Sequence, residues 1–85
     1  MDDVTSVVKD YILTTFLPGE NPAFLTPSTE LMQSGILDSL ATLELVSFLE
    51  SRYAIELEAH DVDSSNLGTL TAIDRLIRSK LAGRP

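Results

Sequence analysis

The residues with the clearest chemical potential form the segment Gly35-Ile36-Leu37-Asp38-Ser39-Leu40, where a long connection meets an expected helix. A serine at a helix start is by default a cap, because its hydroxyl accepts a hydrogen bond from an unpaired backbone N–H group. Asp38 can cap the helix one position earlier, which leaves the Ser39 hydroxyl free to point outward. A phosphodiester on that hydroxyl would lie at the positive end of the helix dipole. The segment therefore predicts either an ordinary cap or a modified serine.

Patterns typical of enzymes and metal sites are sparse in this chain. It has one histidine, His60, it has no cysteine, and no G-x-S-x-G elbow surrounds a serine. We expect His60 to be exposed, and we predict no catalytic residue, although a hydrolase that uses Ser39 would need His60 brought beside it. Asp61-Val62-Asp63 resembles the start of a calcium loop, but the Gly and closing Glu of that motif are missing. We therefore predict no metal site.

The spacing of the apolar residues predicts four helices that would position the Ser39 segment. The expected helices cover residues 3–16, 39–53, 61–67 and 70–81. Pro18-Gly19 ends the first helix, and Asp61 and Thr69 are the expected caps of the third and fourth. Residues 54–58 alternate apolar and polar, but we interpret them as an extended link because no second strand is available to pair with them.

Residues 17–38 form a long connection that is too apolar to be a simple solvent-exposed loop. We expect its apolar side chains to fold back over the core, with a short helical turn near residues 28–33. These side chains are Phe24, Leu25, Leu31, Met32, Ile36 and Leu37. The predicted fold is all-α, with a long first loop and a short third helix, in one domain over residues 1–85.

The second predicted helix has an apolar face and a mixed face. The residues on the expected core-facing arc are Thr42, Leu45, Val46, Leu49 and Tyr53. Glu44, Ser47 and Ser51 lie opposite, with Leu40 among them and Leu43 at the edge near Glu50. Two leucines outside the core-facing arc indicate a surface that contacts another molecule.

The net charge of −7 is concentrated in the middle of the chain. Residues 30–63 alone carry −7, the residues before them carry −3, and the tail carries +3. An acidic middle disfavours nucleic acids and anionic membranes and favours basic patches on partner proteins. No apolar run approaches the roughly 20 residues of a membrane span, and the acidic start does not resemble a secretory signal. We expect a soluble, cytoplasmic monomer.

The Gly-Ile-Leu-Asp-Ser-Leu segment, with the following Ala41-Thr42-Leu43-Glu44-Leu45-Val46, resembles the second helix of the acyl carrier protein family. Asn66 to Ile73 is also similar to the approach of that family to its last helix, so the resemblance covers nearly the whole chain. It implies a four-helix acyl-carrier-like bundle that is not an enzyme. It also implies that Ser39, flanked by Asp38 and Leu40, bears a covalent 4′-phosphopantetheine donated by coenzyme A, whose thiol holds acyl groups as thioesters.

The same resemblance implies partners and a docking surface. A phosphopantetheinyl transferase would modify the serine, and acyl- or aminoacyl-activating ligases, acyltransferases and synthases would use the carrier. Leu40 and Leu43 would form the apolar centre of the docking surface, beside Ser47. Glu44 and Glu50 would form its acidic rim.

Two positions depart from the pattern of fatty-acid carriers. Many of those carriers have an acid two residues after the modified serine, where this chain has Ala41, and Arg52 also occupies a position that is often acidic. These departures favour a specialised pathway, either polyketide-type or one loaded with an amino acid, over fatty-acid biosynthesis. The Leu-Asp-Ser segment also resembles D-alanyl and other aminoacyl carriers, which is the main alternative. An unmodified acidic helical module that binds a protein partner is the alternative from another class.

Overall fold

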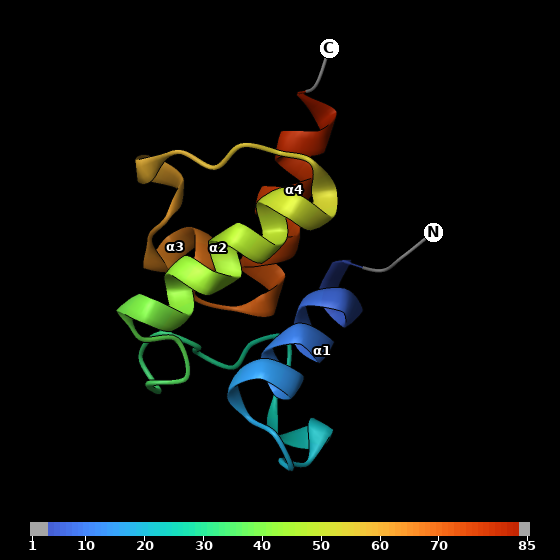
Figure 1. The fold of residues 1–85 in the computed structure, drawn as a ribbon, viewed down its shortest axis with the longest axis vertical. Helices are drawn as coiled ribbons and strands as arrows, with labels where there is room; N and C mark the ends of the chain where they lie inside the picture. The colour runs from blue at the N-terminus through green and yellow to red at the C-terminus, as the bar shows by residue number, and fades with distance from the viewer. Residues whose placement is uncertain (1–3, 84–85) are drawn as a thin grey trace.

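A computed structural model describes residues 4–83 of the chain (Figure 1). It contains the α-helices α1 (Val4–Phe16), α2 (Ser39–Tyr53), α3 (Ser64–Leu67) and α4 (Leu70–Ala82), and the 3₁₀ turns η1 (Pro22–Phe24) and η2 (Ala59–Asp61). Within residues 4–83 there is no strand, and no helix is long and apolar enough to cross a membrane. The predicted all-α bundle with a short third helix is confirmed. Residue 3, expected in the first helix, lies outside the described residues.

Helix α4 is the element against which the other three helices pack (Figure 1). Its buried residues recur at helical spacing, as predicted, and meet the buried faces of α1 and α2. The resulting core contains Val4, Val8, Ile12, Leu25, Leu31, Leu37, Ala41, Leu45, Leu49, Ile55, Leu67, Leu70, Ile73, Leu76 and Ile77. The core-facing arc predicted for the second helix is also confirmed: Thr42, Leu45 and Leu49 are buried, and Val46 and Tyr53 are half-buried.

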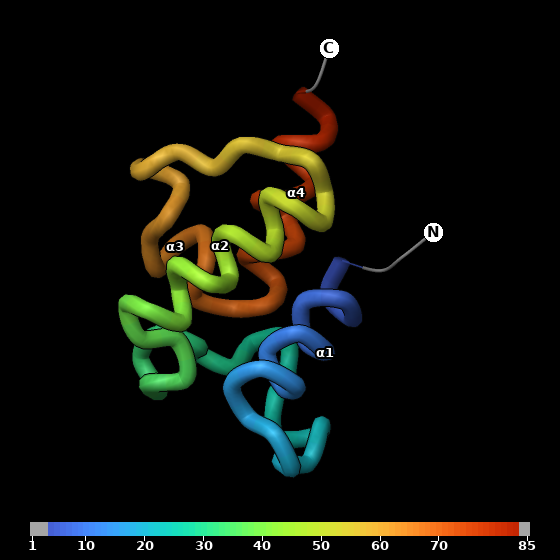
Figure 2. Tube along the Cα trace, in the orientation of Figure 1, coloured from blue at the N-terminus to red at the C-terminus, as the bar shows by residue number. Residues whose placement is uncertain are grey.

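The long connection between α1 and α2 runs along one end of the bundle and is fastened to α3 and α4 (Figure 2). Leu31 N donates to the carbonyl oxygen of Gly68 over 2.7 Å. The Pro27 carbonyl accepts two hydrogen bonds from Thr71, one from its backbone N–H and one from its hydroxyl, each at 3.2 Å. Leu25 and Leu31 are fully buried. The prediction that this connection folds back over the core is therefore confirmed.

Two details of the connection differ from expectation. Its 3₁₀ turn lies at Pro22–Phe24, where Asn21 Oδ1 accepts a hydrogen bond from Ala23 N, while residues 31–35 form only a turn. Phe24 is 53% exposed instead of buried. A proline is favoured at the first position of a helical turn, and here it directs the chain so that Leu25, not Phe24, enters the core.

The third helix is shorter than predicted, and its cap is a different residue. Asp63, not Asp61, caps α3 by accepting a hydrogen bond from Asn66 N. Asp61 ends η2, where its carboxylate accepts from Glu58 N and lies 2.7 Å from Lys80 Nζ of α4. Asp61 is consequently buried, at 7% exposure. The ion pair fastens the link between α2 and α3 to the last helix.

We expect the Asp61–Lys80 pair to make stability depend on pH. The hydrogen bond to Lys80 lowers the pKa of Asp61, and the same bond raises the pKa of Lys80. The Asp61 contribution is therefore present above its unfolded pKa of about 3.9 and is lost as pH falls through the lower folded pKa. The Lys80 contribution is present below about pH 10.4 and is lost as pH rises through the raised folded pKa.

Urea denaturation of Asp61→Asn across acidic and neutral pH measures the acid side of this dependence. The variant should be less stable than the unmodified chain at pH 7, and the difference should shrink toward pH 3. Glu20→Gln, at an exposed acid in the first loop, is the control and should show no such trend. A difference between Asp61→Asn and the parent chain that does not change with pH would contradict the linkage.

Candidate functional site

Ser39 is the first residue of α2, and its side chain is exposed. The cap is Asp38, whose Oδ1 accepts a hydrogen bond from Ala41 N over 2.8 Å. Asp38 has extended backbone angles, and its carbonyl oxygen accepts from Thr42 N over 2.9 Å. The prediction that Asp38 performs the capping is therefore confirmed. The hydroxyl of Ser39 is not required for the cap, so it is available for chemistry.

Removing the Asp38 carboxylate should lower the stability of the fold and leave the Ser39 hydroxyl in the chain. Asp38→Ala is expected to lower the free energy of unfolding by about 1 kcal/mol, the usual cost of losing a side-chain cap. Asp38→Asn should keep most of this stability, because an amide oxygen also accepts from the first-turn N–H groups. Urea denaturation followed by circular dichroism measures both. Equal losses in the two variants would show that charge at the helix dipole, and not capping, is what Asp38 supplies.

An open groove of about 600 Å³ lies beside Ser39. Its walls come from the long connection, from the first turns of α2 and from the residue after η2. The lining residues are Met32, Leu37, Asp38, Ser39, Thr42, Leu43 and Val62. Apolar side chains therefore lie next to the exposed hydroxyl. Met32 and Val62 were not among the predicted site residues, because they are remote from Ser39 in sequence.

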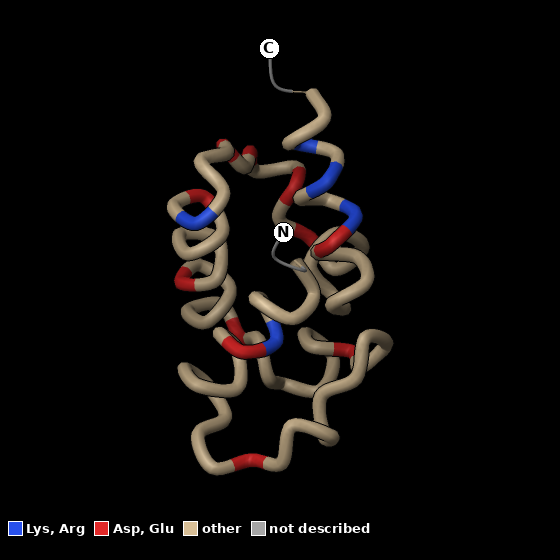
Figure 3. Tube along the Cα trace, turned by 90° about the vertical axis from the view of Figure 1, so that its right-hand side faces the viewer, with Lys and Arg blue, Asp and Glu red and all other residues tan. Residues whose placement is uncertain are grey.

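The exposed face of α2 next to Ser39 is formed by Leu40, Leu43, Glu44 and Ser47, and Ser51 and Arg52 are exposed farther along the helix. Leu40 is 67% exposed and Leu43 is 63% exposed, which are high values for leucine in a bundle with a packed core. Both lie within the first five residues of α2, as expected. Figure 3 shows acidic positions along α2 on one side of the molecule and basic positions along α4 on the other. The exposed face thus combines apolar side chains with negative charge.

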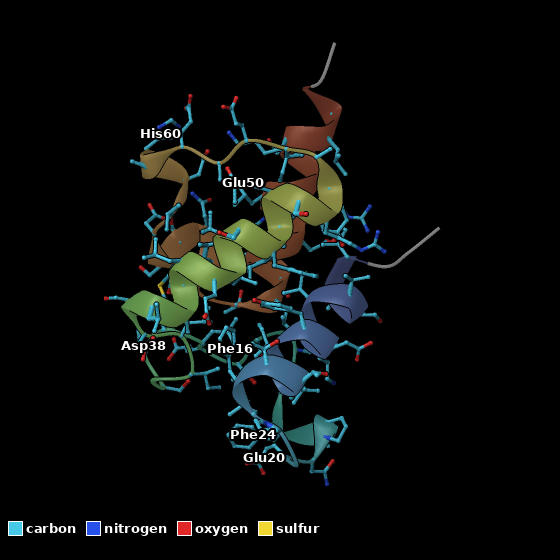
Figure 4. The ribbon with its side chains drawn as sticks, in the orientation of Figure 1. Phe16, Glu20, Phe24, Asp38, Glu50 and His60 are labelled. Carbon is cyan, nitrogen blue, oxygen red and sulfur yellow. The ribbon has the colours of Figure 1, made fainter. Side chains whose placement is uncertain are left out.

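Glu50 differs from the other predicted docking residues. Its Oε2 accepts a hydrogen bond from Leu57 N over 2.9 Å, and its side chain is half-buried. Figure 4 shows Glu50 next to the link that follows α2. Ala54, in the left-handed region at φ 53°, turns the chain at the end of α2 so that this bond can form. Glu50 therefore holds the link after α2 in place. To act in the acidic rim of the docking surface, as expected, its carboxylate would have to give up the hydrogen bond from Leu57 N.

A second groove, between α1 and α2, adjoins the exposed face. Its lining residues are Tyr11, Thr15, Leu43, Glu44, Ser47 and Phe48. The rings of Tyr11 and Phe48 stack at 4.0 Å between centroids, and the Tyr11 hydroxyl donates to the Glu44 carbonyl oxygen over 3.3 Å. Burial and the negative charge of Glu44 raise the pKa of Tyr11. Sequence reasoning missed this groove, because it exists only when α1 and α2 lie side by side.

His60 is exposed, as predicted, and it lies well away from Asp38 in Figure 4. Its Nε2 is 3.4 Å from Glu58 Oε2 and 3.6 Å from Asp61 Oδ1. Each of the three side chains has one atom that could bind a metal ion, and these atoms lie within 4.8 Å of one another. This cluster was not predicted. Its one buried carboxylate, that of Asp61, is already paired with Lys80. A hydrolase that uses Ser39 with His60 as its base does not fit this arrangement.

Residues 17–73, from the long connection to α4, match the family model described as phosphopantetheine attachment site. The chain belongs to this family. Its domains carry a covalently attached 4′-phosphopantetheine and are carriers, not catalysts. The chain is accordingly a carrier protein, and the predicted family, cofactor and absence of catalysis are confirmed. A search among curated proteins found no relative with a significant match.

The described residues fit such a group. Ser39 offers an exposed hydroxyl at the start of α2, where the first backbone N–H groups of a helix have no acceptor within it. These groups and the helix dipole favour a phosphodiester at this position. The adjoining groove offers the apolar side chains of Met32, Leu43 and Val62 to the remainder of the arm. The carrier residue itself stays a prediction, as do the docking residues.

Proposed function

We propose that Ser39 is the attachment residue of this carrier and that residues 1–85 act as one carrier domain. The observation that carries the proposal is the exposed Ser39 hydroxyl at the start of α2, freed by the Asp38 cap and inside the stretch that matches the family. Attached to Ser39, the arm supplies a terminal thiol that holds cargo as a thioester. Partner enzymes, and not the chain itself, catalyse every step.

Loading is a transfer catalysed by a phosphopantetheinyl transferase. The Ser39 oxygen forms a new bond to the phosphorus of coenzyme A that bears the pantetheine, and the pyrophosphate bond to that phosphorus breaks. Adenosine bisphosphate leaves, and the hydroxyl proton passes to a base of the transferase. The chain contributes an exposed hydroxyl and a helix N-terminus that stabilises the phosphodiester product.

We propose acyl cargo, in a polyketide-type pathway in preference to fatty-acid biosynthesis. The position of Ala41 supports this preference, because its side chain is buried at 7% exposure. An acid at this position, common in fatty-acid carriers, would place a carboxylate at the edge of the core, which is unfavourable without a partner. The orientation of α2 in this chain therefore favours a small apolar residue, such as alanine, at position 41.

An aminoacyl cargo is the second candidate. The Leu37-Asp38-Ser39 segment, which resembles that of D-alanyl carriers, favours it. Both candidates use the same serine and the same arm, so they differ only in the activating enzyme and the group carried.

Intact-mass analysis after incubation with coenzyme A and a broad-specificity phosphopantetheinyl transferase tests the attachment. The chain should gain the mass of one phosphopantetheine. No gain under conditions that fully load a reference carrier would contradict the proposal and favour an unmodified interaction module.

A separate experiment tests the cargo. The loaded chain is offered in parallel to an acyl-activating ligase and to an aminoacyl-activating ligase, and the thioester products are identified by mass. Acyl loading is the expected result. Exclusive loading with an amino acid would replace the first candidate by the second.

The exposed face of α2 is proposed as the docking surface, with Glu44 attracting basic partners. Glu44→Lys should lower kcat/KM for loading by the transferase about tenfold at low salt, because it reverses a charge that attracts a basic surface. Glu20→Lys makes the same change of net charge in the first loop, far from Asp38 in Figure 4. Equal slowing in both variants would show that total charge, and not the α2 surface, governs the encounter.

A further inference from the structure

Met32 lines two separate recesses. One is the groove beside Ser39, and the other is a smaller recess of about 110 Å³ between the long connection, α3 and the start of α4. The residues that line this smaller recess are Glu30, Met32, Gln33, Ser64, Gly68 and Thr69. No other residue lines both. The half-buried Met32 side chain therefore stands where cargo attached through Ser39 would pass from the first recess toward the second.

The two recesses differ in chemistry. The groove offers apolar side chains from Met32, Leu43 and Val62, which favour an alkyl group. The smaller recess is lined by polar and apolar surface in equal measure, with a carboxylate, an amide and hydroxyl groups beside the Met32 side chain. It can therefore take an alkyl group, although less favourably than the groove does.

The interior below the groove is closed by packing. Leu31, Leu45 and Leu67 are each 0% exposed, and they belong to one continuous core cluster. Native cores are packed as densely as organic crystals, so added methylenes would displace these side chains. Cargo that is longer than the groove therefore meets either the packed core or the Met32 side chain, which stands between the groove and the smaller recess.

We propose that Met32 is a specificity-determining residue that limits the sheltered cargo of this carrier to short acyl groups. The proposal rests on the proposed function, because it requires an arm on Ser39. A longer alkyl chain would extend into solvent or be held by a partner enzyme. Shortening Met32 should join the two recesses and open a path toward Ser64 and Thr69. Methionine is unbranched and flexible, so a smaller side chain at this position should enlarge the space between the two recesses with little movement of the backbone.

The experiment uses the full chain, loaded on Ser39 by a transferase with acetyl-, butyryl- or octanoyl-coenzyme A, and reads backbone amide chemical shifts. In the parent chain, all three cargoes should shift amides of the groove, such as Val62. None should shift Ser64, Gly68 or Thr69. In Met32→Ala, octanoyl cargo should shift these three recess amides in addition. Met32→Leu, which keeps the bulk, should behave as the parent chain does.

Ile36→Ala is the matched control, since Ile36 is also a half-buried apolar residue of the long connection but lines neither recess. Octanoyl shifts at the recess amides of the parent chain would overturn the proposal, as would an unchanged pattern in Met32→Ala or the same gain in Ile36→Ala. If Met32→Ala does not fold, Met32→Val tests the same prediction with a smaller loss of volume. Mass analysis of each sample separates these outcomes from failed attachment, which would contradict the proposed function and this inference together.

Discussion

Ser39→Ala should abolish loading with phosphopantetheine while leaving the free energy of unfolding within about 0.5 kcal/mol of the parent chain. Loading requires a hydroxyl at this position, and alanine has none. Stability is retained because the cap of α2 is Asp38, whose carboxylate accepts from Ala41 N without help from Ser39. If Ser39 were the cap of α2, the same substitution would instead remove both the loading and the stability that the cap provides. Intact mass and urea denaturation of the same sample measure the two effects.

Ser51→Ala is the matched control for this prediction. Ser51 is another exposed serine of α2, outside the proposed docking surface, and the variant should load completely. Loss of loading in both variants would indicate damage to the recognition of α2 instead of loss of the acceptor. Residual loading of Ser39→Ala would place the attachment on a different residue.

Leu45→Ala is expected to have the largest effect on stability, a loss of about 2–5 kcal/mol in the free energy of unfolding. Leu45 is fully buried at the middle of α2, so its truncation leaves a cavity that the packed neighbours fill only partly. Small domains have total stabilities of about 5–15 kcal/mol, so the loss is a large fraction of the whole.

Leu43→Ala provides the comparison on the same helix. Leu43 is 63% exposed, and its truncation should change stability by no more than about 0.5 kcal/mol. It should nevertheless slow loading by the transferase, because the exposed face of α2 loses an apolar contact. Equal losses of stability in Leu43→Ala and Leu45→Ala, measured by urea denaturation, would contradict the orientation of α2 described above.

Local signals explain why α2 and its cap could be predicted from sequence. The apolar spacing from Thr42 to Tyr53 determines which face is buried, and Asp38 stands at the preferred cap position just before Ser39. The exposure of Leu40 and Leu43 follows from the same spacing. All of these inferences depend on residues within about one or two helical turns of one another.

The features that sequence reasoning missed depend on contacts between distant segments. Asp61 and Asp63 are both reasonable caps for α3, and only the position of Lys80 on α4 decides between them. The hydrogen bond from Leu57 N to Glu50 likewise requires the chain to turn back at Ala54. No periodicity places Met32 beside Ser39, because the groove they share exists only after the long connection has packed onto the bundle.

The fastening of the long connection has an evolutionary consequence. Residues 18–21, between α1 and η1, are exposed, and the described hydrogen bonds from the long connection to α3 and α4 begin at Pro27 and Leu31. Insertions in flexible surface segments cost little free energy, whereas insertions between two fixed points disturb both. Homologous chains should therefore vary in length around residues 18–24 and keep a constant spacing from Pro27 to Ser39, so that a longer loop never moves the serine.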